Sequence, residues 1–232
     1  MERQSKSERA LCFGGARMNK RDLFVVVADL DAENTFKTLF AKRQQALGIR
    51  VNFDPAKDLL RYSGRDAGCC KDAVNLLRAP QSSHRHALLC FDHHGSGLDQ
   101  RPRIELEAEI ESRLYANGWP KADAAVIIID PELEAWVWAD SRQVASVLGW
   151  SGNMRSLRAY LEEAYAWPAL ISKPPDPKRA FELALRQVRK PRVATLFKEL
   201  AEKVSLSRCQ DASFQKLRSI LRQWFAHEDS QR

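Results

Sequence analysis

The chain has 232 residues, of which 44% are apolar and 29% are charged, and its mean hydropathy is −0.44. This composition excludes collagen, coiled coil and wholesale disorder, and the length allows a hydrophobic core without covalent staples. No apolar run is long enough to span a bilayer, and the basic N-terminus lacks the apolar stretch of a secretory signal. Five cysteines without C-x-x-C spacing favour reduced thiols. We therefore expect a cytoplasmic protein that has no membrane contact.

The net charge of +7 is concentrated in the last third of the sequence. Residues 1–150 carry 21 basic and 21 acidic side chains, whereas residues 151–232 carry 16 basic and 9 acidic ones. Such an asymmetry indicates a polyanionic partner for the C-terminal part. A solvated basic helix surface without a partner explains it equally well.

The first half of the sequence alternates between strand and helix patterns. We expect a disordered or mobile tail over residues 1–20. An apolar, β-branched run at 23–28 is typical of a strand that is buried on both faces of a parallel sheet. A helix is predicted over 32–47, with Asp31 as its N-cap. Alternating residues at 49–53 predict a second strand, and 66–77 is predicted to be helical.

Strands at 87–91 and 124–129, separated by an acidic helix at 104–115, continue this alternation. The pattern predicts an α/β fold over residues 21–148, with a mostly parallel central sheet flanked by helices. Residues 149–232 show no further strand pattern and are predicted to form a basic, all-helical C-terminal part packed on the α/β domain. The helices predicted from residue 141 onward cover 141–148, 154–165, 179–189, 193–203 and 212–225.

Acidic residues stand where three of the predicted strands end, namely Asp29, Asp92 and Asp130. Because the carboxyl ends of parallel strands share one edge of a sheet, their side chains could meet there. Carboxylates that meet repel one another unless a cation neutralises them, and their oxygens suit Mg²⁺ or Mn²⁺. Each aspartate could instead be a helix N-cap. The carboxylates that could converge are Asp29, Asp31, Glu33, Asp92, Asp130, Glu132 and Glu134.

The loop after the third of these strands adds a histidine to the acidic residues. His94 follows Asp92 by two residues, which places both on one side of an extended backbone. With an ordinary pKa of about 6.5, a histidine can serve as a metal ligand or as a general acid or base. A surface or packing role for His94 is the alternative. The two tryptophans after the last strand, Trp136 and Trp138, are predicted to pack helix against sheet.

Three segments resemble Toprim domains, the fold shared by topoisomerases, primases and the nuclease domain of overcoming-lysogenization-defect proteins. The sequence DLDAENTF at 29–36 is similar to the first Toprim motif, and DHHG at 92–95 falls where the family has an Asp-x-Asp pair. The segment DPELEAWVWAD at 130–140 looks like the PE-x-EAW-xx-AD segment of Toprim-like proteins that are often encoded among bacterial phage-defence genes. With the segments 172–178 and 213–217, the resemblance covers about residues 22–225.

The resemblance implies a divalent-metal site that acts on phosphodiesters. Asp92 and Glu134 would be metal ligands, Asp29 a proton-handling residue or a water-mediated ligand, and His94 a ligand or general acid/base. Asp130 and Glu132 would be further ligands unless one of them caps a helix. Asp29 stands where the family has Glu, and His94 stands where it has the second Asp. The histidine favours Mn²⁺ over Mg²⁺, or the altered site holds no metal at all.

Two functions follow from the resemblance. The first is a metal-dependent nuclease or phosphodiester-handling component of a bacterial antiphage defence system. The second is a catalytically degenerate binding or assembly subunit of a DNA-acting restriction or modification complex. Both imply DNA and other defence proteins as partners, and a pure protein-interaction module is a third possibility. The residues predicted to contact nucleic acid are Lys173, Lys178, Arg179 and Lys190.

Overall fold

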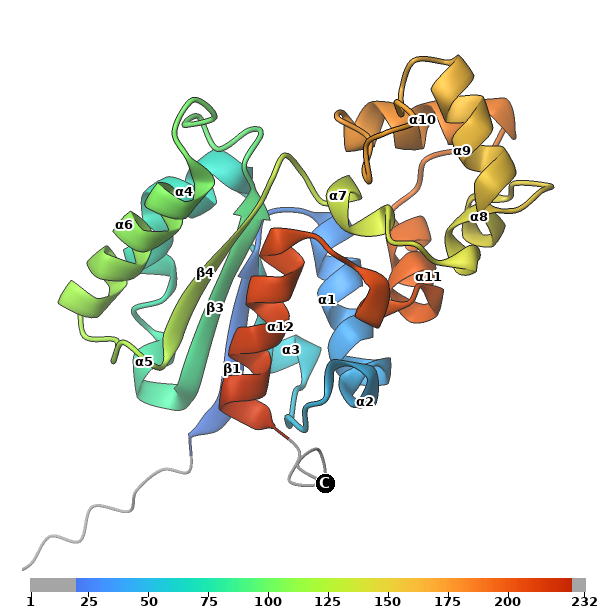
Figure 1. Cartoon of the computed structure of the whole chain (residues 1–232). Helices are drawn as coiled ribbons and strands as arrows, with labels where there is room; N and C mark the ends of the chain where they lie inside the picture. Colours follow the sequence, from blue (N-terminus) through green and yellow to red (C-terminus); the bar gives the residue numbers. More distant parts are fainter. Residues whose placement is uncertain (1–19, 227–232) are drawn as a thin grey trace, which may run out of the picture.

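A four-stranded sheet forms the centre of the molecule in the computed structural model, which describes residues 20–226 (Figure 1). All its strand pairs are parallel, and the strand order is β2-β1-β3-β4. The predicted α/β fold is confirmed. Of the predicted tail, all residues but Lys20 lie outside the described part. The strands are β1 (Arg21–Val27), β2 (Leu59–Arg61), β3 (His84–Asp92) and β4 (Ala124–Ile129).

Helices surround the sheet and continue beyond it. Within residues 20–226, none of them combines the length and the apolar character that crossing a membrane requires. The α-helices are α1 (Leu30–Lys42), α2 (Gln44–Leu47), α3 (Pro55–Asp58), α4 (Arg65–Leu76), α5 (Pro80–Ser83), α6 (Arg103–Ala116), α7 (Glu134–Val137), α8 (Arg142–Leu148), α9 (Met154–Glu163), α10 (Pro177–Gln187), α11 (Thr195–Lys203) and α12 (Ala212–Phe225). A short 3₁₀ turn, η1, spans Leu206–Arg208.

The central strands are buried on both faces, as their apolar runs predict. Because successive side chains point to opposite faces, Val25 and Val26 of β1 enter two different cores. Figure 1 shows α4 and α6 on one side of the sheet, and α1 and α12 on the other. The core on the α1 side also contains Phe181 of α10 and Leu200 of α11. The C-terminal helices therefore share a core with the sheet.

The predicted strand at 49–53 is wrong. Ile49 makes an isolated bridge to Ala226, and the strand that pairs with β1 on the side away from β3 is β2, ten residues further on. The side chain of Gln44 satisfies the Val51 backbone instead: its amide donates to the Val51 carbonyl (2.9 Å), and its oxygen accepts from the Val51 N–H (2.8 Å). An amide side chain thus takes the place of a neighbouring strand.

The sheet ends at β4 because side chains occupy the free edge of that strand. Glu107 of α6 accepts a hydrogen bond from the Ile128 N–H (2.9 Å), and Glu111 accepts one from the Val126 N–H (3.0 Å). Lys216 of α12 donates to the Val126 carbonyl (2.9 Å) and forms ion pairs with both glutamates. An unpaired strand edge would otherwise be open to pairing with another chain.

We expect Glu107→Ala to lower the free energy of unfolding by about 3 kcal/mol. The glutamate is 3% exposed, so its loss leaves the Ile128 N–H without an acceptor and the partly buried Arg103 without its ion pair. Glu107→Gln keeps an acceptor oxygen and should cost about half as much. Urea unfolding measures both, with Glu105→Ala, an exposed residue of the same helix, as the control. A loss for Glu107→Ala no larger than that of the control would contradict this role.

Candidate functional site

The acidic residues at the strand ends lie along one edge of the sheet. Asp29 follows β1, Asp92 is the last residue of β3, and Asp130 follows β4. The parallel pairing runs in register up to that edge, where Asp92 pairs with Ile129 of β4. In open α/β sheets, binding sites form at this edge.

Asp29 caps the helix that begins after β1. Its Oδ1 accepts a hydrogen bond from the Ala32 N–H (2.8 Å), which makes it the N-cap of α1. The predicted cap, Asp31, lies instead within the first turn and is buried. The structure thus confirms a helix-cap role for Asp29, and the cap uses only one of its two carboxylate oxygens.

Asp66 brings a further carboxylate to this edge. It lies in the first turn of α4, and its Oδ1 accepts a hydrogen bond from the Asp92 N–H (2.8 Å). Burial raises the pKa of Asp66, and the negative charge of Asp29 raises it further. Sequence reasoning missed this residue because the strand before it, β2, was not predicted. Its position at the start of a predicted helix was the only signal.

Asp92 is the centre of the acidic group. Burial raises its pKa well above the usual range, and the negative charge of Asp66 is the next cause. Asp29 and Glu134 raise it as well, whereas a hydrogen bond from the backbone of Leu133 acts in the opposite direction. We call these four interacting residues, Asp29, Asp66, Asp92 and Glu134, the carboxylate edge. The negative charges of the other three residues all act to raise the pKa of Asp92.

Glu134 reaches the carboxylate edge because the short helix α7 is anchored through its tryptophan. The Trp136 Nε1–H donates to Ser213 Oγ (2.8 Å) and to Asp211 Oδ1 (3.2 Å) at the start of α12. The indole lies against Phe214, with ring centroids 5.2 Å apart. Trp136 and Trp138 are both buried, in accordance with their predicted packing role.

Arg192 neutralises one side of the group. It comes from the loop between α10 and α11, and its Nη2 lies 2.7 Å from Asp31 Oδ2 and 2.9 Å from Glu134 Oε1. Burial raises the pKa of Asp31 and of Glu134, and the guanidinium opposes both shifts. Sequence reasoning missed Arg192 because more than fifty residues separate it from either carboxylate.

The remaining predicted ligands lie toward β4. Asp130 is exposed, and its Oδ1 is 3.3 Å from Nδ1 of the buried His93. Glu132 forms an ion pair with Lys178 (2.8 Å). His94 is exposed and lines a hollow of about 530 Å³ together with Asp130 and Glu132. These residues thus flank the carboxylate edge.

The four residues predicted to contact nucleic acid differ in their surroundings. Lys173 forms an ion pair with Asp211 (2.5 Å), and the Lys190 ammonium donates to the Val147 carbonyl (2.6 Å). Lys178 is held by Glu132. The side chain of Arg179 has no ion pair within residues 20–226 and lines the same hollow as His94. Internal contacts therefore engage three of the four cations.

The donors of the carboxylate edge fit a divalent cation in their chemistry. Carboxylate oxygens are the ligands that Mg²⁺ and Mn²⁺ prefer, and the repulsion around Asp92 is what a bound cation would relieve. In the part of the chain that the structure describes, no three His, Cys, Asp or Glu side chains form a ready-made metal site. Asp29, Asp66 and Asp92 are the members of the carboxylate edge that form no ion pair with Arg192.

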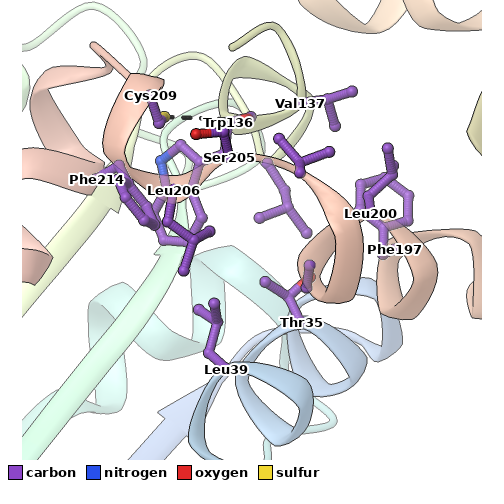
Figure 2. A pocket seen from close by; sticks show the side chains of 13 residues that line it. Thr35, Leu39, Trp136, Val137, Phe197, Leu200, Ser205, Leu206, Cys209 and Phe214 are labelled. Carbon is purple, nitrogen blue, oxygen red and sulfur yellow. Dashed lines mark hydrogen bonds between the residues drawn. The ribbon is translucent and has the colours of Figure 1, made fainter. Parts of the chain in front are cut away.

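A second hollow, shown in Figure 2, is of a different kind. It measures about 40 Å³ and is surrounded by apolar side chains such as Leu39, Phe197 and Phe214, which come from α1, α11 and α12. A space of this size holds only a few water molecules. It is a packing gap between the helices and offers no chemistry of its own.

Three comparisons with known proteins gave no match to this sequence. No family model matches the sequence, and searches of curated proteins and of solved structures found no significant match. Function therefore has to be inferred from the site itself and from the motif resemblance.

We expect Asp92→Asn to raise the free energy of unfolding at pH 7 by on the order of 1 kcal/mol, a common size for one substitution. The raised pKa means that the folded protein binds the Asp92 proton more tightly than the unfolded chain does. Its contribution to stability therefore falls as the pH rises from the ordinary value of 3.8 through the folded-state pKa. Urea unfolding between pH 4 and pH 8 should show a smaller decline for the variant. Parallel curves for the two proteins would contradict this.

We expect Arg192→Ala to lower the free energy of unfolding by about 2 kcal/mol, because it leaves the buried Glu134 carboxylate without its counter-charge. Burial then raises the pKa of Glu134 without opposition, so the loss should shrink as the pH falls. Arg186→Ala, an exposed arginine on α10, is the matched control. Equal losses in thermal and urea unfolding for the two variants would show that the ion pairs contribute nothing.

Proposed function

We propose that this chain is a Toprim-like protein that acts on phosphodiesters of DNA with the help of a divalent cation. The observation that carries the proposal is the meeting of carboxylates at one edge of the sheet, where Asp66 Oδ1 accepts a hydrogen bond from the Asp92 N–H (2.8 Å). Desolvation raises the pKa of Asp92, and the negative charges of Asp66 and Asp29 raise it further. Repulsion of this kind costs stability and persists where it serves a function. A bound cation is the simplest use for it.

Residues at this edge would bind the cation, attract the phosphate and transfer the proton. Asp29, Asp66 and Asp92 would hold the cation, which supplies charge stabilisation for phosphoryl transfer when bound. Arg192 and Lys178 bring positive charge to the same edge, where it can attract a phosphate. We assign proton transfer to His94, which the motif resemblance implies as a ligand or general acid/base and which lines the hollow beside Asp130 and Glu132.

The biological setting of the proposal comes from the motif resemblance. The segment 130–140 is similar to that of Toprim-like proteins encoded among phage-defence genes, so we propose a role in bacterial antiphage defence. DNA and other proteins of the defence system would be its partners, in the cytoplasm.

A second function is favoured by the ion pairs of Arg192. This guanidinium contacts both Asp31 and Glu134, and Lys178 engages Glu132, so part of the acidic edge already has its counter-charges. A chain in which protein cations replace the metal could bind DNA without cutting it. It would then be a degenerate binding or assembly subunit of a restriction or modification complex.

A cation titration tests the first function. We expect millimolar Mn²⁺, and less strongly Mg²⁺, to raise the melting temperature by several degrees, because a ligand that binds the folded state stabilises it. Asp92→Asn should abolish the increase, whereas the control Glu105→Gln should keep it. A melting temperature that does not change with either cation would remove the basis of the proposal.

A cleavage assay on DNA separates the two functions. With Mn²⁺ present, wild-type protein should cut DNA, and Asp92→Asn should lower the rate at least about 100-fold, the scale on which loss of a key electrostatic group acts. Cleavage that survives Asp92→Asn would show that the carboxylate edge is not catalytic. DNA binding without cleavage at any cation concentration would support the degenerate subunit instead.

A further inference from the structure

A hollow next to β1 is lined by three arginines and by two aspartates, Asp29 and Asp31. It measures about 520 Å³ and lies where the β2–α4 turn faces the loop between α10 and α11. Arg61 ends β2, Arg65 begins α4, and Arg192 comes from the loop. Because β2 and β4 are at opposite sides of the sheet, this hollow lies across the carboxylate edge from Asp130. We call it the arginine hollow.

Arg65 lies at the start of α4, beside Asp66, whose pKa its positive charge lowers. Its side chain is exposed, and it has no ion pair or hydrogen bond in the part of the chain that the structure describes. Its φ of 53° lies in the left-handed region, which costs a side chain other than glycine about 1 kcal/mol. Strain of this kind gathers at binding and catalytic sites. An unpaired guanidinium held in a strained turn is therefore available to a ligand.

The other two arginines form ion pairs but keep donors that a ligand can reach. Arg61 Nε lies 3.1 Å from Glu33 Oε2, and the side chains of Arg61 and Arg192 are 49% and 37% exposed. The exposed Arg61 pair contributes between about 0 and 1 kcal/mol, so an arriving anion can displace it at little cost. Arg192 contacts Asp31 and Glu134 through Nη2, and its Nε and Nη1 can donate to an anion while those contacts stay in place. The planar fork of a guanidinium matches two phosphate oxygens at once. The arginine hollow thus has the chemistry of a phosphate-binding groove.

We propose that the arginine hollow binds backbone phosphates of a nucleic-acid strand through Arg61, Arg65 and Arg192. The inference deepens the proposed function and rests on it for the reaction, because Asp29 belongs to both the hollow and the carboxylate edge. Binding itself needs only the arginines. A strand that enters over β2 passes Asp29 and carries its phosphates to the carboxylates.

Binding in the absence of divalent cations tests the inference. Fluorescence anisotropy with a labelled single-stranded oligonucleotide, at low salt and in EDTA, gives the affinity of the full chain. We expect Arg65→Asn and Arg61→Gln each to weaken binding about 3- to 10-fold and to reduce the salt slope by about one. Asparagine tolerates the left-handed backbone, so Arg65→Asn removes the charge without new strain.

The matched control is Arg50→Gln, which removes the same charge from an exposed arginine. Arg50 lies at the opposite edge of the sheet, because its neighbour Asn52 donates to Asp22 at the start of β1. Its affinity should stay within about twofold of the wild type. Equal losses for Arg65→Asn and Arg50→Gln, or no binding by the wild type, would overturn the inference. So would displacement by AMP or inorganic phosphate at the same phosphate concentration, which would identify a free phosphate as the ligand.

The outcome is separable from that of the proposed function. Asp92→Asn leaves the arginines in place and should bind the oligonucleotide in EDTA at least as tightly as the wild type. Arginine-dependent binding supports the inference even if no cation raises the melting temperature. A melting temperature that rises with a cation would support the proposed metal site. If oligonucleotide binding is then unchanged by the Arg61 and Arg65 substitutions, the arginine hollow is overturned.

Discussion

Parallel pairing brings every strand's carboxyl end to the same edge of the sheet, and this constraint governs the rest of the molecule. Acidic residues that follow β1 and β3 cannot avoid one another once the sheet forms. Asp66 joins them because it satisfies the Asp92 N–H. The chain therefore has to neutralise this edge or tolerate its repulsion. It neutralises the Glu134 side with Arg192 and leaves the Asp92 side exposed to like charges.

Several basic residues of the C-terminal third form contacts within the protein. Lys173 neutralises Asp211, Lys190 binds a carbonyl of α8, and Lys216 closes the edge of β4. Asp211 in turn anchors Trp136 and with it Glu134. The helical part is thus a scaffold for the acidic edge, because it supplies both a carboxylate and its counter-charge. A net charge of +7 in the sequence does not translate directly into a polyanion-binding surface.

The sequence predicted those elements whose positions depend on local patterns of apolar residues. The runs that became β1, β3 and β4 are apolar on both faces, and only a strand inside a layered fold buries both, so their positions and parallel pairing were predictable. Residues 49–53 show the limit, because alternation reveals a buried face but not the partner, here the side chain of Gln44. Asp66 and Arg192 were missed for a related reason. Both act on residues distant in the sequence, and only the folded chain brings them together.

Asp29 lies between a group of carboxylates and a group of arginines. On one side lie Asp66 and Asp92, whose mutual repulsion disfavours a second anion and favours a cation. On the other lies the arginine hollow, which favours an anion. A phosphodiester bound with a divalent cation needs both, with the positive ion between carboxylates and phosphate. Under the proposed function, the carboxylates would hold the cation and the arginines would hold the phosphate, so each would bind more tightly when the other is present.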